Sequence, residues 1–194
     1  MARLAAYPEP MNVEQFLAFA ATRPDGEKWE LLDGELFLNA SPVRPHQRIV
    51  ANLIRHLYEP LRAAGNTLEA ILGIGVRISD ISAVEPDVMI RPRDGFRGNM
   101  CDDIVAAFEV LAPSTRRNDL EFKRSGYAAM ANLTLYVVIA PEKIEVRVYS
   151  RAANWRETTL TGLEDRIAFE SLNIALTLRE IYEDMADLLD PEEK

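Results

Sequence analysis

Cysteine and long apolar runs are scarce in this chain of 194 residues. Cys101 is the single cysteine, so one chain holds no internal disulfide framework and no zinc site built from cysteines. The longest apolar run is about eight residues, far below the ~20 that a membrane-spanning helix needs. The first ten residues, MARLAAYPEP, hold an apolar patch too short for a secretory signal. Together these absences predict a cytoplasmic protein.

Basic side chains are also in the minority, with 22 Lys and Arg against 31 Asp and Glu and a net charge of −9. Non-specific binding to nucleic acid depends on basic side chains that neutralise phosphates, so this balance argues against it. Part of the acidity lies in residues 183–194, an acidic C-terminal tail with six acids and one base. Residues 91–124 are near neutral, with seven bases and six acids, but they form no basic patch.

The length is that of one domain, which we place at residues 1–194. A chain of this size buries roughly 70% of the surface that it exposes when unfolded, enough for a sizeable core. The sequence contains no internal repeat, no low-complexity segment and no convincing linker.

Helices are predicted from capping patterns and apolar spacing. Asn12 followed by Gln15 is a variant of the capping box, and Thr177 followed by Glu180 is a full one. A stripe of apolar residues with the helical period runs between them, after two prolines. The predicted helices open at residue 12, run over about 46–61 and about 117–131, and open again at residue 177.

Strands are predicted from short apolar runs that end at turn residues. Asp33-Gly34 is the strongest hairpin signal, because both central residues of a type I′ turn need a positive φ. It places Glu30 on the first strand of the hairpin and residues 35–38 on the second. The other predicted strands cover 67–78, 84–90, 104–112, 133–139, 144–149 and, more weakly, 155–160. This order of elements predicts a mixed α/β fold around one central sheet.

Four charged residues interrupt patterns that are otherwise apolar: Glu30, Asp87, Glu109 and Lys123. A buried, unpaired charge is unfavourable by about several kcal/mol, so such a residue needs a partner or a task. Carboxylates on neighbouring strands, together with an inward lysine, would suit a divalent metal. Mg²⁺ prefers oxygen ligands, usually one or two carboxylates with substrate phosphate and several waters.

Each of these residues also has a structural alternative. Asp87 follows a proline and is typical of a turn, while Glu109 would pair with a nearby arginine. Lys123 would form a surface ion pair with Asp119, which contributes about a few tenths of a kcal/mol. Glu30 would be an exposed strand residue. Their combination on consecutive elements, each at an inward or strand-end position, favours a shared site.

Several separated motifs, in order, resemble one known family. The motifs are WELLDGEL, PHQRIV, EPDVMI, FEVLAPST and RRNDLEFKRSGYAAMANLTLYVV. They resemble the Uma-type restriction endonucleases of the PD-(D/E)XK nuclease superfamily over about residues 13–181. The resemblance implies a single restriction-endonuclease-like domain, an α/β (α+β) fold whose central mixed β-sheet is flanked by helices. It also implies metal-binding acids on two adjacent strands.

The resemblance assigns roles to particular residues. Asp87 matches the aspartate of the PD element and Glu109 matches the (D/E) position, and the backbone carbonyl of Val110 would be a further metal ligand. The sequence departs from the superfamily pattern two residues after Glu109, where Leu111 stands in place of the usual lysine. Lys123, on the following helix, matches the position to which the lysine has moved in this family.

Two further matches and two departures complete the comparison of motifs. Glu30 matches the acid of the hairpin motif, and His46 matches the histidine at a helix start, although a histidine there is also typical of a cap or a surface. Ala112 stands where the family often has serine, and residues 134–141 lack an acid and a tryptophan found in the family. Neither departure touches the expected metal ligands.

The resemblance implies an endonuclease that uses Mg²⁺ or Mn²⁺ to hydrolyse phosphodiester bonds in DNA. Catalytic roles would fall to Asp87, Glu109, Lys123, Glu30 and His46. A homodimer would build a composite positive groove from the arginines at 91, 93, 97, 116 and 117. The acidic net charge leaves an alternative open, a non-catalytic module that keeps the nuclease fold and binds nucleic acid or protein.

Overall fold

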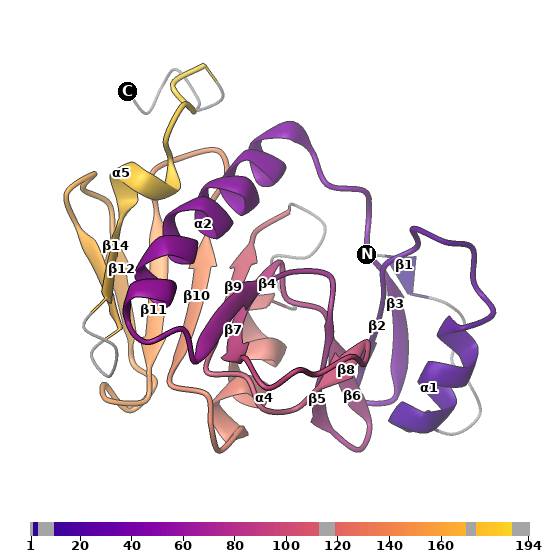
Figure 1. Cartoon of the computed structure of the whole chain (residues 1–194). Helices are drawn as coiled ribbons and strands as arrows, with labels where there is room; N and C mark the ends of the chain where they lie inside the picture. Colours follow the sequence, from indigo (N-terminus) through magenta and orange to yellow (C-terminus); the bar gives the residue numbers. More distant parts are fainter. Residues whose placement is uncertain (1, 4–9, 113–118, 170–173, 188–194) are drawn as a thin grey trace.

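The computed structural model describes residues 2–3, 10–112, 119–169 and 174–187. Across these residues it contains two six-stranded sheets and a separate two-stranded hairpin (Figure 1). The mixed α and β class predicted from the sequence is confirmed. One feature differs from the prediction of one central sheet, because the N-terminal hairpin belongs to a second sheet.

The central sheet is mixed, and its inner strands are buried. In spatial order its strands are β12 (Glu157–Leu160), β11 (Val146–Ser150), β10 (Leu135–Ile139), β9 (Ala106–Val110), β7 (Val88–Pro92) and β4 (Leu68–Ile71). β9 and β10 are parallel, while the other neighbouring pairs of these strands are antiparallel. Parallel strands need a crossover connection. This one carries the π-helix η1 (Asp119–Lys123) and the helix α4 (Arg124–Ala129).

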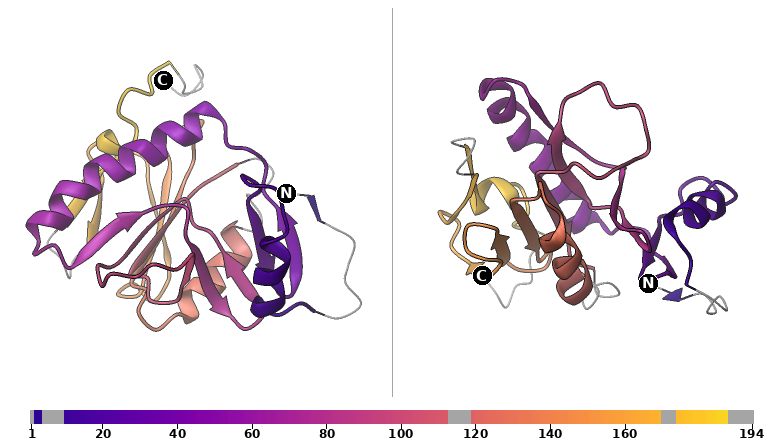
Figure 2. Two further views of the ribbon diagram at one scale, coloured as in Figure 1. Left: turned by 45° about the vertical axis from the view of Figure 1, so that its right-hand side comes forward. Right: turned by 90° about the horizontal axis from the view of Figure 1, so that it is seen from below.

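Different elements cover the two faces of the central sheet (Figure 2). The long helix α2 (Arg44–Ala63) packs its apolar stripe on the face that contains Phe108. Tyr127 of α4 packs on the opposite face, together with Ala107. Side chains alternate between the faces along a strand, so Glu109 lies on the face of Ala107. Its carboxylate therefore points toward the crossover.

The second sheet, called here the hairpin sheet, lies at the N-terminal end of the molecule (Figure 1). In order its strands are β1 (Ala2–Arg3), β3 (Glu35–Leu38), β2 (Trp29–Leu32), β6 (Ser82–Val84), β5 (Gly75–Ser79) and β8 (Met100–Cys101). Asp33 and Gly34 form the predicted tight turn, with φ of 51° and 77°. The helix α1 (Val13–Ala20) opens with the predicted capping box of Asn12 and Gln15 and packs on this sheet.

Two of the chain's crossings between the two sheets fall within segments predicted as single strands, and the sequence did not reveal either of them. Residues 67–78, predicted as one strand, divide into β4 of the central sheet and β5 of the hairpin sheet, with Gly73 between them at a φ of 72°. Residues 84–90 divide in the same way into the end of β6 and the start of β7. Pro86 lies at this second break, where it has no amide hydrogen to donate to a ladder.

The C-terminal part adds a hairpin and a short helix beside α2. The strands β13 (Arg166–Phe169) and β14 (Ile174–Thr177) were not predicted. The helix α5 (Leu178–Ile181) begins with the predicted capping box of Thr177 and Glu180. The buried amide of Asn52 on α2 donates hydrogen bonds of 2.9 Å to the carbonyls of Ile181 and Glu183. The end of α5 and the residues directly after it are thereby fixed to α2.

The remaining helices differ from prediction at their ends. α2 begins at Arg44 rather than at residue 46, because Pro45 suits the first turn of a helix. The helix predicted at 117–131 covers residues 119–129 as a π-helix followed by an α-helix, and residues 117–118 lie outside the described part. The predicted acidic tail is described only as far as residue 187. No helix within the described residues is both long enough and apolar enough to cross a bilayer.

Candidate active site

Glu109 is the fourth residue of β9 and is only 3% exposed. Its carboxylate accepts a hydrogen bond of 3.1 Å from the hydroxyl of Tyr127 and further hydrogen bonds from the ammonium of Lys123. A carboxylate buried without partners would be unfavourable by about several kcal/mol. Glu109 is therefore tolerated in an apolar strand because two donors from the crossover reach it.

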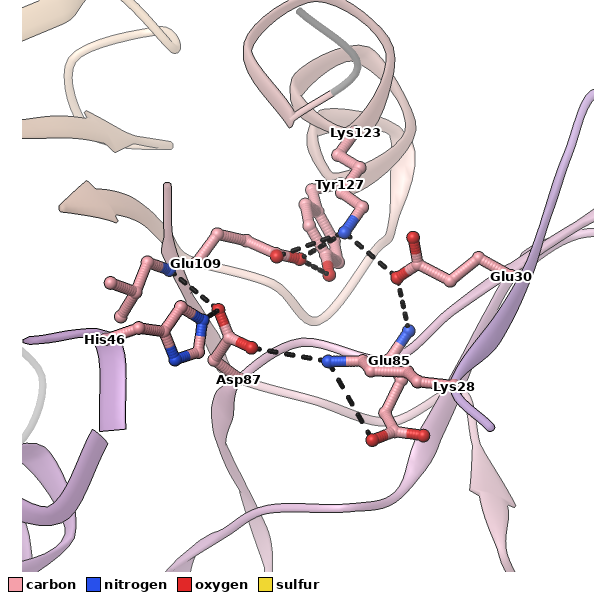
Figure 3. Close-up of polar contacts among 9 residues, drawn as sticks. Lys28, Glu30, His46, Glu85, Asp87, Glu109, Lys123 and Tyr127 are labelled. Carbon is pink, nitrogen blue, oxygen red and sulfur yellow. Dashed lines mark hydrogen bonds and ion pairs between the residues drawn. The ribbon is translucent and has the colours of Figure 1, made fainter. Parts of the chain in front are cut away.

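Lys123 is the last residue of η1 and is 2% exposed. Its Nζ lies 3.0 Å from both carboxylate oxygens of Glu109 and 3.0 Å from Oε1 of Glu30 (Figure 3). Lys123 and Tyr127 are four residues apart, a spacing that places both on the same side of a helix. Lys123 is thus a buried residue, not the surface residue that the structural alternative required.

Asp87 stands directly before β7, where the chain leaves the hairpin sheet. β7 pairs with β9 so that Val88 lies opposite Phe108. Extending this register by one residue places Asp87 opposite Glu109. The sheet therefore brings together the two carboxylates that the sequence predicted on neighbouring strands.

Three different elements hold the Asp87 carboxylate. Oδ2 accepts a hydrogen bond of 2.8 Å from the backbone N–H of Val110 and lies 3.2 Å from Nε2 of His46, in the first turn of α2. Oδ1 lies 3.3 Å from Nζ of Lys28. The predicted histidine thus reaches the site through Asp87, while its Nδ1 is buried without a hydrogen-bond partner.

Glu30 joins the hairpin sheet to the site. It is fully buried, and its Oε1 accepts hydrogen bonds of 3.0 Å from Lys123 and from the backbone N–H of Glu85. Its Oε2 is buried and has no hydrogen-bond partner. Lys28, two residues before Glu30, also lies 3.8 Å from Oε1 of Glu85. The result is a network of alternating charges that links both sheets and the crossover (Figure 3).

The network shifts the proton equilibria of its members. Burial alone would raise the pKa of Asp87, but the hydrogen bond with His46 and the charge of Lys28 outweigh it and hold this pKa well below its ordinary value. Burial likewise opposes ionisation of Glu30, and the charges of Lys123 and Lys28 lower its pKa overall. Burial would lower the pKa of Lys28, yet Asp87 and Glu30 raise it. These groups are held in their charged forms.

The functional side chains border one cavity of about 310 Å³. Its lining includes Lys28, His46, Asp87, Glu109, Val110 and Lys123. Glu30 does not line the cavity, and it contacts Lys123 from the side of the hairpin sheet. The structure therefore brings together all five of the predicted catalytic residues, four at the cavity and Glu30 behind them.

The oxygen donors at the cavity fit a hard divalent cation. Asp87 and Glu109 present carboxylates from adjacent strands, which is the number of carboxylates that Mg²⁺ commonly takes from a protein. Within the described residues no three Asp, Glu, His or Cys side chains are grouped as metal ligands. The protein would therefore supply the two carboxylates and a backbone oxygen, such as that of Val110. The unpaired Oε2 of Glu30 adds acceptor capacity nearby.

Sequence reasoning missed three residues of the network. Lys28 lies in a polar stretch before a strand, where a lysine gives no signal of function. Glu85 contributes both its N–H and its carboxylate. The spacing in the sequence places Tyr127 on the same apolar helix face as Lys123, but an aromatic there reads as ordinary core and gives no sign of a hydrogen bond to Glu109.

Arg91, one of the five arginines expected to build the basic groove of a dimer, is not available for it. Arg91 is 2% exposed, and its guanidinium pairs with Asp94 at 3.2 Å and with Asp103 at 3.1 Å. Glu69 is a third carboxylate partner, at 3.6 Å, so this buried arginine offers no charge to DNA. Arg93 and Arg97 are exposed, while residues 116 and 117 lie outside the described part of the chain.

Comparison with known protein families assigns the chain to one of them. Residues 13–179 match the model of a family described as Uma2, putative restriction endonuclease. The chain belongs to the Uma2 family. Membership of the Uma2 family confirms the resemblance seen in the sequence motifs, and the match contains all of the predicted site residues.

Among solved structures, the Uma2 chain resembles the crystal structure of a putative nuclease belonging to DUF820 from Anabaena variabilis ATCC 29413. The TM-score is 0.72 at 14% sequence identity, and the match covers 89% of this chain and 98% of that one. At this identity the likeness establishes the fold alone. No curated protein matches the sequence.

Proposed function

We propose that this Uma2-family protein is a metal-dependent endonuclease that hydrolyses phosphodiester bonds in DNA. The observation that carries the proposal is that Asp87, directly before β7, and Glu109, on the adjacent strand β9, line one cavity, with Lys123 bound to Glu109. Paired carboxylates with a buried lysine suit metal-assisted attack of water on phosphorus.

Asp87, Glu109 and the carbonyl of Val110 would hold the cation, Mg²⁺ or Mn²⁺. Divalent metals are general in restriction-endonuclease-like families. When bound, the metal supplies polarisation of the phosphate and a more acidic water. The chain's own part is to fix these oxygens, which it does through the hydrogen bond from Val110 to Asp87 and that from Tyr127 to Glu109.

Lys123 orients the attacking water or stabilises the negative charge that develops on the phosphate. Its ammonium faces the cavity and is held on two sides by Glu30 and Glu109. Such preorganised charge counts most where water is excluded. Glu30, which does not line the cavity, would act by positioning Lys123. His46 would position Asp87 through Nε2 and is also close enough to the cavity to contact substrate.

DNA is the proposed substrate and a homodimer the proposed assembly, with the cytoplasm as the location. The net charge of −9 gives the protein no general attraction to nucleic acid. We therefore expect cleavage to depend on the positive charges at the cavity, those of the metal and the lysines, rather than on a basic surface. Light scattering across a concentration series would show the dimer, and a monomer at high concentration would exclude it.

The decisive experiment is cleavage of supercoiled, linear and single-stranded DNA with Mg²⁺ or Mn²⁺. Asp87→Asn, Glu109→Gln and Lys123→Met keep the side-chain volume and remove the charge. We expect each to reduce cleavage by about a hundredfold or more. Glu164→Gln is the matched control, because Glu164 is exposed and pairs with Arg179 away from the cavity.

The outcomes separate the alternatives. Metal-dependent cleavage that is lost in all three variants and kept in Glu164→Gln supports the nuclease. Metal binding without cleavage of any DNA would redirect the search to RNA or branched DNA. A protein that neither binds metal nor cleaves would favour the non-catalytic binding module, for which the acidic net charge is the supporting observation.

A further inference from the structure

Two lysines face the carboxylates of the site, and they are held to different degrees. Nζ of Lys123 lies 3.0 Å from Glu30 and from Glu109, and its side chain is 3% exposed. Nζ of Lys28 lies 3.3 Å from Asp87 and 3.8 Å from Glu85, and its side chain is 29% exposed. Lysine has a flexible four-carbon stem. Of the two, Lys28 is therefore the cation that can move into the cavity that it lines.

The two oxygens of Asp87 have different partners. Oδ2 is occupied by the backbone N–H of Val110 and by His46, both fixed by a strand or a helix. Oδ1 is occupied by the ammonium of Lys28. A cation that reaches Asp87 from the cavity therefore competes with Lys28 for Oδ1.

The charge balance makes such an exchange favourable. Within the network, four carboxyl groups, those of Glu30, Glu85, Asp87 and Glu109, face the two ammonium groups of the lysines. One divalent cation matches the surplus of negative charge. A phosphodiester then brings a further negative charge, with which an ammonium released from Asp87 can pair.

We propose that Lys28 is an exchangeable counterion that covers Asp87 in the metal-free protein and binds the substrate phosphate once a divalent cation has taken Asp87. This inference rests on the proposed function and adds a substrate-binding residue to it. The two lysines thus have different roles. Lys123 stays beside Glu109, whereas Lys28 moves from Asp87 to the substrate phosphate.

The test is Lys28→Met, measured in two ways. Calorimetric titration with Mn²⁺, without DNA, should show about two- to fivefold tighter binding, the factor expected from removing a partly exposed ion-pair competitor. If Lys28 only held Asp87 in place, Lys28→Met would instead bind Mn²⁺ more weakly than the wild type. The KM for DNA should rise by about tenfold or more, as expected for the loss of a charge-assisted hydrogen bond.

Two further variants control the result. Lys28→Arg keeps the charge, so we expect Mn²⁺ affinity at or below that of the wild type and a KM between those of the wild type and Lys28→Met. Should Lys28→Met fail to fold, Lys28→Gln, which also removes the charge, carries the test with the same expected results. Lys143→Met removes a lysine that pairs with Glu145 at 2.7 Å and does not line the cavity. It should change neither quantity.

The result can contradict this inference without contradicting the nuclease. If the wild type binds Mn²⁺ and cleaves DNA, and Lys28→Met shows unchanged or weaker Mn²⁺ affinity or an unchanged KM, Lys28 is not an exchangeable counterion. A wild-type protein that neither binds Mn²⁺ nor cleaves would overturn the proposed function, and this inference with it.

Discussion

The ammonium of Lys123 lies 3.0 Å from both carboxylate oxygens of Glu109, although 14 positions separate the two residues in the sequence. The usual superfamily spacing would put the lysine at position 111, where Leu111 packs on the same face of the sheet as Ala107. Lys123 reaches that face from the crossover above it. The spatial relationship between acid and lysine is thus obtained from a different element.

Removal of the Lys123 ammonium should destabilise the fold. Lys123→Met leaves Glu30 and Glu109 buried without their shared cation, a loss that costs about 3–5 kcal/mol when one partner of a buried pair is removed. Urea unfolding in the presence of a chelator measures it. Adding Glu30→Gln and Glu109→Gln to Lys123→Met should recover part of the loss. A single variant as stable as the wild type would mean that the buried ion pair contributes nothing.

Loss of the Tyr127 hydroxyl should weaken the support of Glu109. Tyr127→Phe keeps the ring that packs against Tyr136 and removes the donor to Glu109. A hydrogen bond to a charged group contributes about 1.5–3 kcal/mol to stability. We expect a decrease of that size in the unfolding free energy, together with weaker Mn²⁺ binding. Tyr58→Phe, at an exposed position on α2, is the control and should change neither.

The tight turn of the β2–β3 hairpin should not accept alanine. Gly34 has a φ of 77°, and a Cβ there would lie 2.5 Å from Cβ of Pro10. Gly26 also has a positive φ, 92°, but a Cβ there would meet no atom within 4 Å. Gly34→Ala should therefore cost clearly more than the ~1–3 kcal/mol of backbone strain alone, and Gly26→Ala no more than that. Equal melting temperatures of the two variants would contradict the predicted clash.

The phenol of Tyr149 should ionise at a higher pH than that of an ordinary tyrosine. Burial and the hydrogen bond to Glu157 raise its pKa to about 12. Because the folded protein favours the neutral phenol, its contribution to stability is complete below pH ~10, the ordinary pKa of tyrosine, and is lost as the pH rises through the folded value. Phenolate absorbance, with Tyr149→Phe subtracted, measures it. Glu157→Gln should move the midpoint toward the ordinary value, and an unmoved midpoint would show that the carboxylate has no effect.

Local chemistry made a large part of the fold predictable. The capping boxes at Asn12 and Thr177 and the Asp33-Gly34 turn are signals between near neighbours, and the structure contains all three. The charged residues of the site were found for a related reason. A charge such as Glu109 in a buried strand is unfavourable without partners, so its presence indicates a site before any partner is known.

The missed features depend on contacts between distant residues. Residues 67–78 are rich in apolar side chains on both sides of Gly73, so composition alone does not show that the strand changes sheets there. Lys28 became part of the site through contacts with Glu85 and with Asp87, the latter 59 positions away. Arg91 reads as a surface charge beside a loop, yet Asp94 and Asp103 make its burial possible.

The crossover that carries Lys123 also sets the order in which the centre can form during synthesis. Lys123 contacts Glu30, 93 positions earlier, and β9, which carries Glu109, is enclosed between two strands only when β10, which ends at Ile139, has paired on the side opposite β7. Contacts of such wide sequence separation form slowly, because long loops must close first. A nascent chain that has not passed β10 therefore carries the two strand acids without their assembled lysine. Whatever reaction the centre catalyses begins only after most of the polypeptide has left the ribosome.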